Sequence, residues 1–73
     1  MQIKIYGKDN CEYCDQAKAV CEMVKAPFVY KRLDHDYSSE ELIALAPKLK
    51  TYPAVFIDDD YIGGFTELAE RLV

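Results

Sequence analysis

The sequence predicts an α/β domain in which three helices cover a four-stranded mixed sheet, in the order β-α-β-α-β-β-α. Two observations lead to this prediction. The chain opens with a strand, a helix and a second strand, and its last third holds two short apolar strands and a helix. The opening unit implies a parallel strand pair with a right-handed crossover, whereas the later hairpin adds antiparallel strands. We expect the 73 residues to form one domain, 1–73.

The first half of the chain carries the clearest periodicities. Apolar and polar residues alternate over 2–6, which predicts a strand. Apolar residues then recur at spacings of three and four, which predicts a helix from residue 11 or 12 to about residue 24. Pro27 blocks its continuation, and residues 28–33 read as the second strand.

The second helix is predicted from its ends. Ser38 and Glu41 have the spacing of a capping box, so a helix should begin there. Pro47 disfavours helical geometry at Ala46 and predicts the end of the helix near that residue.

The last third of the chain predicts a hairpin and a short helix. The continuous apolar run 54–57 suits a strand that is covered on both faces. Asp58 to Asp60 then form a turn, residues 61–62 return as an antiparallel strand, and Gly63-Gly64 ends it. Thr66 can cap a final helix over 67–72.

Composition excludes several classes of function. The net charge of −4 argues against a general nucleic-acid binder, which needs a basic face for phosphates. No apolar run approaches the roughly 18 residues of a membrane span, and the first residues do not resemble a signal peptide. A cytoplasmic location is therefore expected, and a stable structural disulfide is not expected there.

Cys11 and Cys14 are the main candidates for chemistry, and three interpretations compete for them. They could be unreactive buried thiols, half of a zinc site, or a redox dithiol. Zinc needs four ligands, but Cys21 follows Cys14 by seven residues on one helix, about 10 Å away. We therefore expect no metal. Cys11 lies where a loop enters a helix, and the helix N-terminus stabilises a thiolate there.

Cys21 itself falls on the apolar stripe of the first helix and should be a buried hydrophobe. His35 should be a solvated loop residue.

The sequence resembles the glutaredoxin family along essentially its whole length. The resemblance is carried by the Cys11–Cys14 motif, by Thr51-Tyr52-Pro53 and by Gly63-Gly64-Phe65-Thr66-Glu67-Leu68. It implies the thioredoxin fold and the activity of a thiol–disulfide oxidoreductase, with Cys11 as the nucleophile and Cys14 as the resolving thiol. It also implies a cis peptide bond before Pro53.

The same resemblance implies a groove for glutathione, which would be the co-substrate and the source of electrons. The backbone of Tyr52 would pair with its cysteinyl part, and backbone N–H groups at the last helix would hold its γ-glutamyl carboxylate. The implied glutathione-binding residues are Lys8, Tyr13, Lys50, Tyr52, Pro53, Gly64, Phe65, Thr66 and Glu67.

The expected partners are glutathione and disulfide-containing proteins, with ribonucleotide reductase as one recipient that the resemblance suggests, and the protein is expected to be a monomer. Three alternatives stay open: a donor reduced by thioredoxin reductase, a scaffold for a glutathione-ligated iron–sulfur cluster, and an interaction domain with inert thiols.

Glu12 departs from the proline that is most common in the family motif. Its carboxylate should oppose thiolate formation and make the dithiol more reducing.

Overall fold

The computed structural model describes residues 1–73 and contains seven elements. Their order is β-α-β-α-β-β-α, as predicted. They are β1 (Ile3–Gly7), α1 (Glu12–Met23), β2 (Phe28–Arg32), α2 (Ser39–Leu45), β3 (Ala54–Ile57), β4 (Asp60–Gly63) and α3 (Phe65–Leu72).

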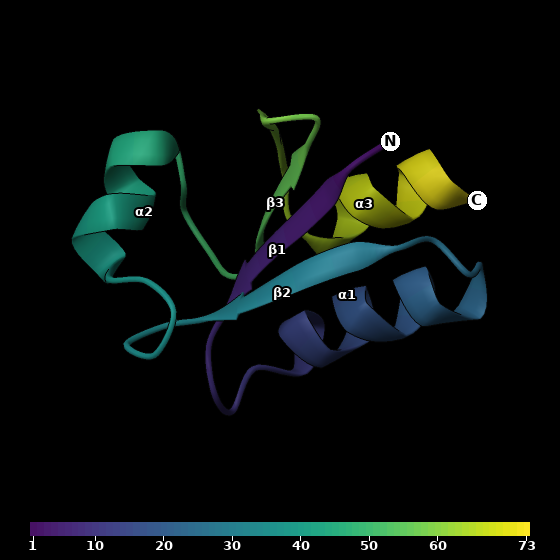
Figure 1. Ribbon diagram of the computed structural model, residues 1–73, viewed down its shortest axis with the longest axis horizontal. Helices are drawn as coiled ribbons and strands as arrows, with labels where there is room; N and C mark the ends of the chain where they lie inside the picture. The colour runs from purple at the N-terminus through teal and green to yellow at the C-terminus, as the bar shows by residue number, and fades with distance from the viewer.

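The four strands form one mixed sheet in the order β2-β1-β3-β4 (Figure 1). The first strand lies inside the sheet, parallel to β2 with Ile3 opposite Phe28, and antiparallel to β3 with Ile5 opposite Val55. The hairpin partner β4 lies antiparallel to β3 at the other edge. The predicted mixed sheet is therefore confirmed, and its central strand leads directly into the Cys11 loop.

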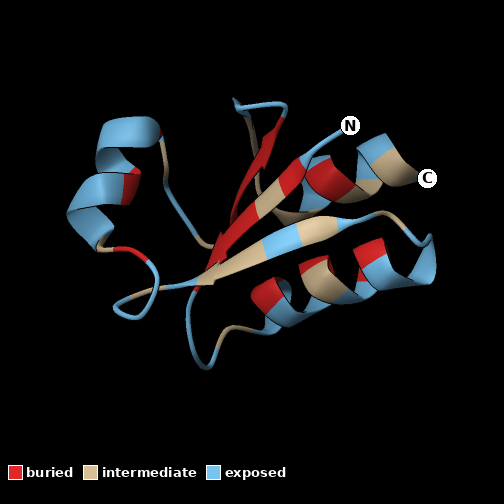
Figure 2. Cartoon of the chain, in the orientation of Figure 1, coloured by how far each residue is buried: buried red, intermediate tan, exposed pale blue.

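Helices cover both faces of the sheet, with α1 and α3 on one face and α2 across from them (Figure 1). Successive side chains of a strand point to opposite faces, so β1 and β3 each supply both cores. The larger core packs the sheet against α1 and α3, and the smaller core packs it against α2 (Figure 2). The larger core contains Ile3, Ile5, Ala17, Val20, Cys21, Val55, Ile57 and Leu68. The smaller core contains Tyr6, Tyr37, Leu42, Ala46, Ala54 and Phe56.

Two boundaries in the last third of the chain differ from the prediction. The last helix begins at Phe65, not at residue 67, and Gly64 is its N-cap. The Glu67 carboxylate accepts a hydrogen bond of 2.7 Å from the Gly64 N–H, which places the cap two residues before Thr66. In the hairpin, Asp58 and Asp59 both have positive φ, so these two residues make the whole turn and Asp60 already belongs to β4.

The longest helix, α1, has 12 residues. None of the three helices has the length and the apolar character that crossing a bilayer requires.

Candidate active site

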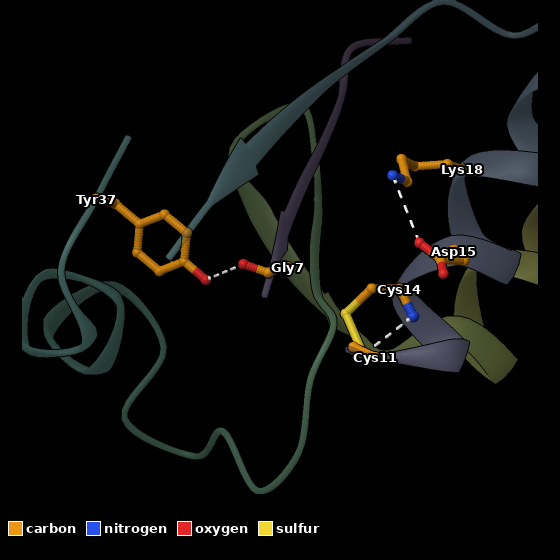
Figure 3. Close-up of a disulfide and its surroundings, with 6 residues drawn as sticks. All are labelled: Gly7, Cys11, Cys14, Asp15, Lys18 and Tyr37. Carbon is orange, nitrogen blue, oxygen red and sulfur yellow. Dashed lines mark hydrogen bonds and ion pairs between the residues drawn. A yellow bond between two sulfur atoms is a disulfide. The ribbon is translucent and has the colours of Figure 1, made fainter. Parts of the chain in front are cut away.

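Cys11 and Cys14 lie at the N-terminus of α1 (Figure 3), which a short loop joins to β1 (Figure 1). Cys11 is the N-cap residue, with an extended backbone at φ −125° and ψ 104°. The two residues form a disulfide, and their Cα atoms are 5.2 Å apart. Cys14 is fully buried, whereas Cys11 is partly exposed. Only the Cys11 sulfur is therefore open to an incoming disulfide.

The start of α1 provides a favourable environment for a thiolate at Cys11. The Cys14 N–H donates a hydrogen bond of 3.2 Å to the Cys11 sulfur. This contact, together with the positive end of the helix dipole, stabilises negative charge on that sulfur. Glu12 and Asp15 lie in the same first turn and are exposed, so their charges act in the opposite direction through solvent.

The loop that carries Cys11 is anchored at its start through Gly7. The Gly7 carbonyl accepts one hydrogen bond from the Leu33 N–H at 2.9 Å and another from the Tyr37 hydroxyl at 2.8 Å (Figure 3). Tyr37 is buried, and burial raises the pKa of its hydroxyl well above the ordinary value. A Cβ atom at Gly7 would collide with the Tyr30 ring, which explains the glycine. The sequence did not reveal the Tyr37 contact.

A groove of about 510 Å³ lies beside the start of α1, within the size range of small-molecule sites. Its lining residues are Tyr13, Lys48, Lys50, Thr51, Tyr52, Pro53, Tyr61, Ile62, Gly63, Gly64, Phe65, Thr66 and Glu67. Eight of the nine residues that the resemblance implied for glutathione are among them. The peptide bond between Tyr52 and Pro53 is cis, as predicted.

The groove combines aromatic rings with polar and charged groups. The rings of Tyr13 and Phe65 approach each other, with centroids 6.0 Å apart, and so join α1 to α3. The N-terminus of α3 lies in the same wall, and a helix N-terminus attracts anions. Lys48 and Lys50 also line the groove and bring two positive charges. The resemblance did not imply Lys48. The signal that could have identified it is the Lys-x-Lys spacing, which places both lysines shortly before the cis bond.

Lys8 is the one predicted residue that does not line this groove. Its ammonium group lies 5.3 Å from the centroid of the Tyr52 ring, close enough for a cation–π contact. Lys8 therefore lies at the border of the groove, between Tyr52 and the loop that precedes Cys11.

The remaining predictions concern residues outside the groove. Cys21 is a free cysteine, fully buried in the larger core, as predicted. His35 is exposed in its turn, also as predicted, and its Nε2 atom lies 3.0 Å from Nη2 of Arg32. No three histidine, cysteine or acidic side chains gather closely enough to hold a metal ion.

Comparisons with known proteins give one consistent family. The family model described as Glutaredoxin matches residues 3–62. Glutaredoxin 1 of Escherichia coli K12 is 34% identical over 76 residues, an alignment that covers 94% of this chain and 89% of the relative.

Two solved structures resemble the fold of the chain, and the first of them also matches its length. The first is the glutaredoxin-like protein NrdH-redoxin from Escherichia coli, described as having a thioredoxin-like activity profile. It has a TM-score of 0.79 and 28% identity, and the match covers 100% of this chain and 96% of that one. The second is a buckwheat glutaredoxin–glutathione complex, with a TM-score of 0.78 and 25% identity, over 94% of this chain and 66% of that one. The thioredoxin-like fold is thereby confirmed.

Proposed function

Because the chain belongs to the glutaredoxin family and is thereby a thiol–disulfide oxidoreductase, we propose that it uses glutathione to reduce protein disulfides and glutathione mixed disulfides. The observation that carries this proposal is the position of the groove. A cavity of about 510 Å³ meets the Cys11–Cys14 motif at Tyr13 and combines a cis-proline backbone, a helix N-terminus and two lysines.

In the proposed mechanism, Cys11 attacks and Cys14 resolves. The Cys11 thiolate forms a bond with one sulfur of the substrate disulfide, and the other sulfur leaves as a thiolate and takes up a proton. Cys14, one helical turn later, then displaces the first substrate sulfur and forms the intramolecular disulfide. Two glutathione molecules, in two further exchanges, return the pair to the dithiol and become oxidised glutathione. The burial of Cys14 supports this division of roles, because only Cys11 is reachable from outside.

The groove fits the chemistry of glutathione at three points. The backbone of Tyr52, which lines the groove, would offer strand-like hydrogen bonds to the cysteinyl residue. Backbone N–H groups of Phe65 and Thr66, at the α3 N-terminus, suit the γ-glutamyl carboxylate. Lys50 and Lys48 suit the glycine carboxylate at the other end.

A thioredoxin-like electron source is the second candidate. It is favoured by the likeness to NrdH-redoxin, which spans the whole chain. In that case thioredoxin reductase would reduce the disulfide directly, and the groove would bind part of a protein chain. For either electron source, ribonucleotide reductase is a proposed recipient and the cytoplasm the proposed location, both on the basis of the family resemblance.

Two parallel reduction assays test the proposed electron source. The oxidised protein is mixed with NADPH, glutathione reductase and glutathione in one assay, and with NADPH and thioredoxin reductase in the other. We expect NADPH consumption in the first assay only. Consumption in the second assay alone would replace the proposal with the thioredoxin-like alternative.

A trapping experiment tests the two cysteine roles. Reduced Cys14→Ser protein incubated with oxidised glutathione should form a stable adduct on Cys11, detectable by intact-mass spectrometry. The Cys11→Ser protein is the matched control and should remain unmodified at Cys14. An adduct on Cys14 in the control, with none on Cys11 in the test variant, would reverse the roles.

A further inference from the structure

A second groove lies beside the loop that leads into Cys11, and Lys8 is the only one of its lining residues that the resemblance implied for glutathione. Its volume is about 420 Å³, and it is lined by Lys8, Asp9, Asn10, Asp15, Lys18, Tyr30 and Arg32. Tyr13 of the first groove and Asp15 of the second are two residues apart on α1, so they point about 200° apart around the helix. Figure 3 shows Asp15 and Lys18 on α1 beside the disulfide. The two grooves therefore meet the segment that carries Cys11 from different sides, the first at Tyr13 and the second at Asn10 and Asp15.

The two carboxylates in the second groove are already paired. Arg32 donates two hydrogen bonds to the Asp9 carboxylate, at 3.1 and 3.2 Å, and these bonds hold the pKa of Asp9 below its ordinary value. The Asp15 carboxylate lies 3.5 Å from the ammonium group of Lys18. Neither acid is left to repel an incoming anion strongly.

Positive charge is in excess in this groove, although the whole protein has a net charge of −4. Three cations face two carboxylates, and Lys8 forms no ion pair. The Lys18 ammonium also lies 4.3 Å from the centroid of the Tyr30 ring, which fixes it over the groove. Lys8 and the amide of Asn10 are therefore free to donate to a carboxylate, and Lys18 can share its ammonium group between Asp15 and an incoming carboxylate.

We propose that the second groove binds an acidic side chain of the protein substrate, close in sequence to the cysteine that reacts. This inference rests on the proposed role of Cys11 as the attacking thiolate. Glutathione is a tripeptide, and the proposed function assigns it to the first groove. A polypeptide continues past the reacting sulfur on both sides, so it alone reaches the second groove. The second groove thus selects disulfides that are flanked by Asp or Glu.

The chemical step is the exchange already described, with a peptide as the oxidant. The Cys11 sulfur bonds to one sulfur of the peptide disulfide, and the other peptide sulfur leaves and takes up a proton. Cys14 then releases the first peptide sulfur as a second thiol. The peptide gains two electrons and two protons, and the Cys11–Cys14 dithiol loses them.

A single-turnover experiment tests the preference for acidic substrates. Protein reduced with dithiothreitol and desalted is mixed with peptides that share one internal disulfide and differ only in flanking Glu, Gln or Lys residues. The reaction is stopped with acid, and reduced peptide is separated by chromatography. We expect the rate constants to fall in the order Glu, Gln, Lys, and the preference for Glu to weaken at high salt.

Two variants of the groove should change the ratio of the Glu rate to the Gln rate in opposite directions. Lys18→Gln removes a cation and leaves Asp15 unpaired, so the ratio should fall about two- to fivefold, the effect of one exposed ion pair. Asp15→Asn frees Lys18, so the ratio should rise. Lys25→Gln changes the net charge equally, just beyond the C-terminal end of α1, and should preserve the ratio.

Three results would overturn the proposal. The first is equal rates for the three peptides, and the second is an equal fall of the Glu-to-Gln rate ratio in Lys18→Gln and Lys25→Gln. The third is a Lys50→Gln variant that no longer prefers the Glu peptide while Lys18→Gln keeps the full preference. The last result would assign the preference to the first groove. The reaction contains no glutathione. Failure of the glutathione assay therefore does not imply failure here, and the two proposals are tested separately.

Discussion

Glu12 stands where the family motif most often has proline, and its charge acts directly on the Cys11 sulfur. It is exposed and is the first residue of α1, directly after Cys11. Its carboxylate disfavours the Cys11 thiolate and so destabilises the reduced protein. Glu12→Gln removes the charge alone, and Glu12→Pro restores the common family residue.

Both Glu12 variants should raise the reduction potential, by about 10–20 mV for an exposed carboxylate. The potential is measured by equilibration with glutathione redox buffers and quantification of the two protein forms. The pKa of the Cys11 thiol, measured from thiolate absorbance, should fall in the same variants. A potential that stays constant or falls in Glu12→Pro would contradict this account of Glu12.

The hydroxyl group of Tyr37 contributes to stability separately from the ring, which packs in the smaller core. Tyr37→Phe should lower the free energy of unfolding by about 1 kcal/mol, because the buried hydrogen bond to the Gly7 carbonyl is lost. The loss should be no larger, since that carbonyl keeps the Leu33 N–H as a donor. Urea denaturation at neutral pH measures the change. Tyr61→Phe, which removes the hydroxyl of a half-buried tyrosine in β4, is the control and should have a smaller effect.

Single residues were predictable from sequence where a local pattern determines them. The Cys11–Cys14 pair, the burial of Cys21 and the cis-proline position each follow from neighbouring residues or from a short motif. The contact between Tyr37 and Gly7 joins residues 30 positions apart, and the ion pair between Asp9 and Arg32 joins β2 to the active-site loop. Such contacts depend on how elements pack, so no spacing in the sequence indicates them.

Among the elements, α2 depends most on its cap. It has only seven residues and buries a single one of them, Leu42. The Ser38 hydroxyl accepts a hydrogen bond from the Glu41 N–H at 3.2 Å. A helix this short gains little from its own propagation, so the cap supplies a large part of its stability.

Ser38→Ala should lower the stability of the protein by about 1 kcal/mol, which corresponds to a decrease in Tm of roughly 4–8 °C for a domain of this size. Thermal unfolding followed by circular dichroism measures it. Ser39→Ala lies one position later, inside the helix, and should be neutral or slightly stabilising. Equal losses in both variants would show that the cap is not the cause.

Element order was predictable because alternation, capping residues and prolines lie within single elements. The start of α3 was not, because two candidates compete there. Thr66 has a good capping side chain, but Glu67 reaches back to the Gly64 N–H and so extends the helix by two residues. The earlier start of α3 matters for function, because it places the helix N-terminus in the wall of the first groove.

On the scale of the whole molecule, three buried or half-buried groups respond to alkaline pH in the same direction. Burial raises the pKa of Tyr37 and of Tyr30 above the ordinary value of 10.0, and that of Cys21 above 9.0. Tyr37 belongs to the smaller core, Cys21 to the larger one, and Tyr30 packs against the larger one. Both faces of the sheet are therefore sensitive to deprotonation.

The oxidised protein should lose stability as the pH rises above about 9. In the unfolded chain these groups release protons at their ordinary pKa values, whereas the folded protein retains them to higher pH. The stability that these protonated groups contribute is complete below their pKa values in the unfolded chain. It is lost as the pH rises through their pKa values in the folded protein. The loss is at most about 1.4 kcal/mol per pH unit for each group. Urea midpoints at pH 8, 9, 10 and 11 measure the slope. Tyr37→Phe should have a shallower slope above pH 10, and an unchanged slope in that variant would exclude Tyr37 as a source of the alkaline loss.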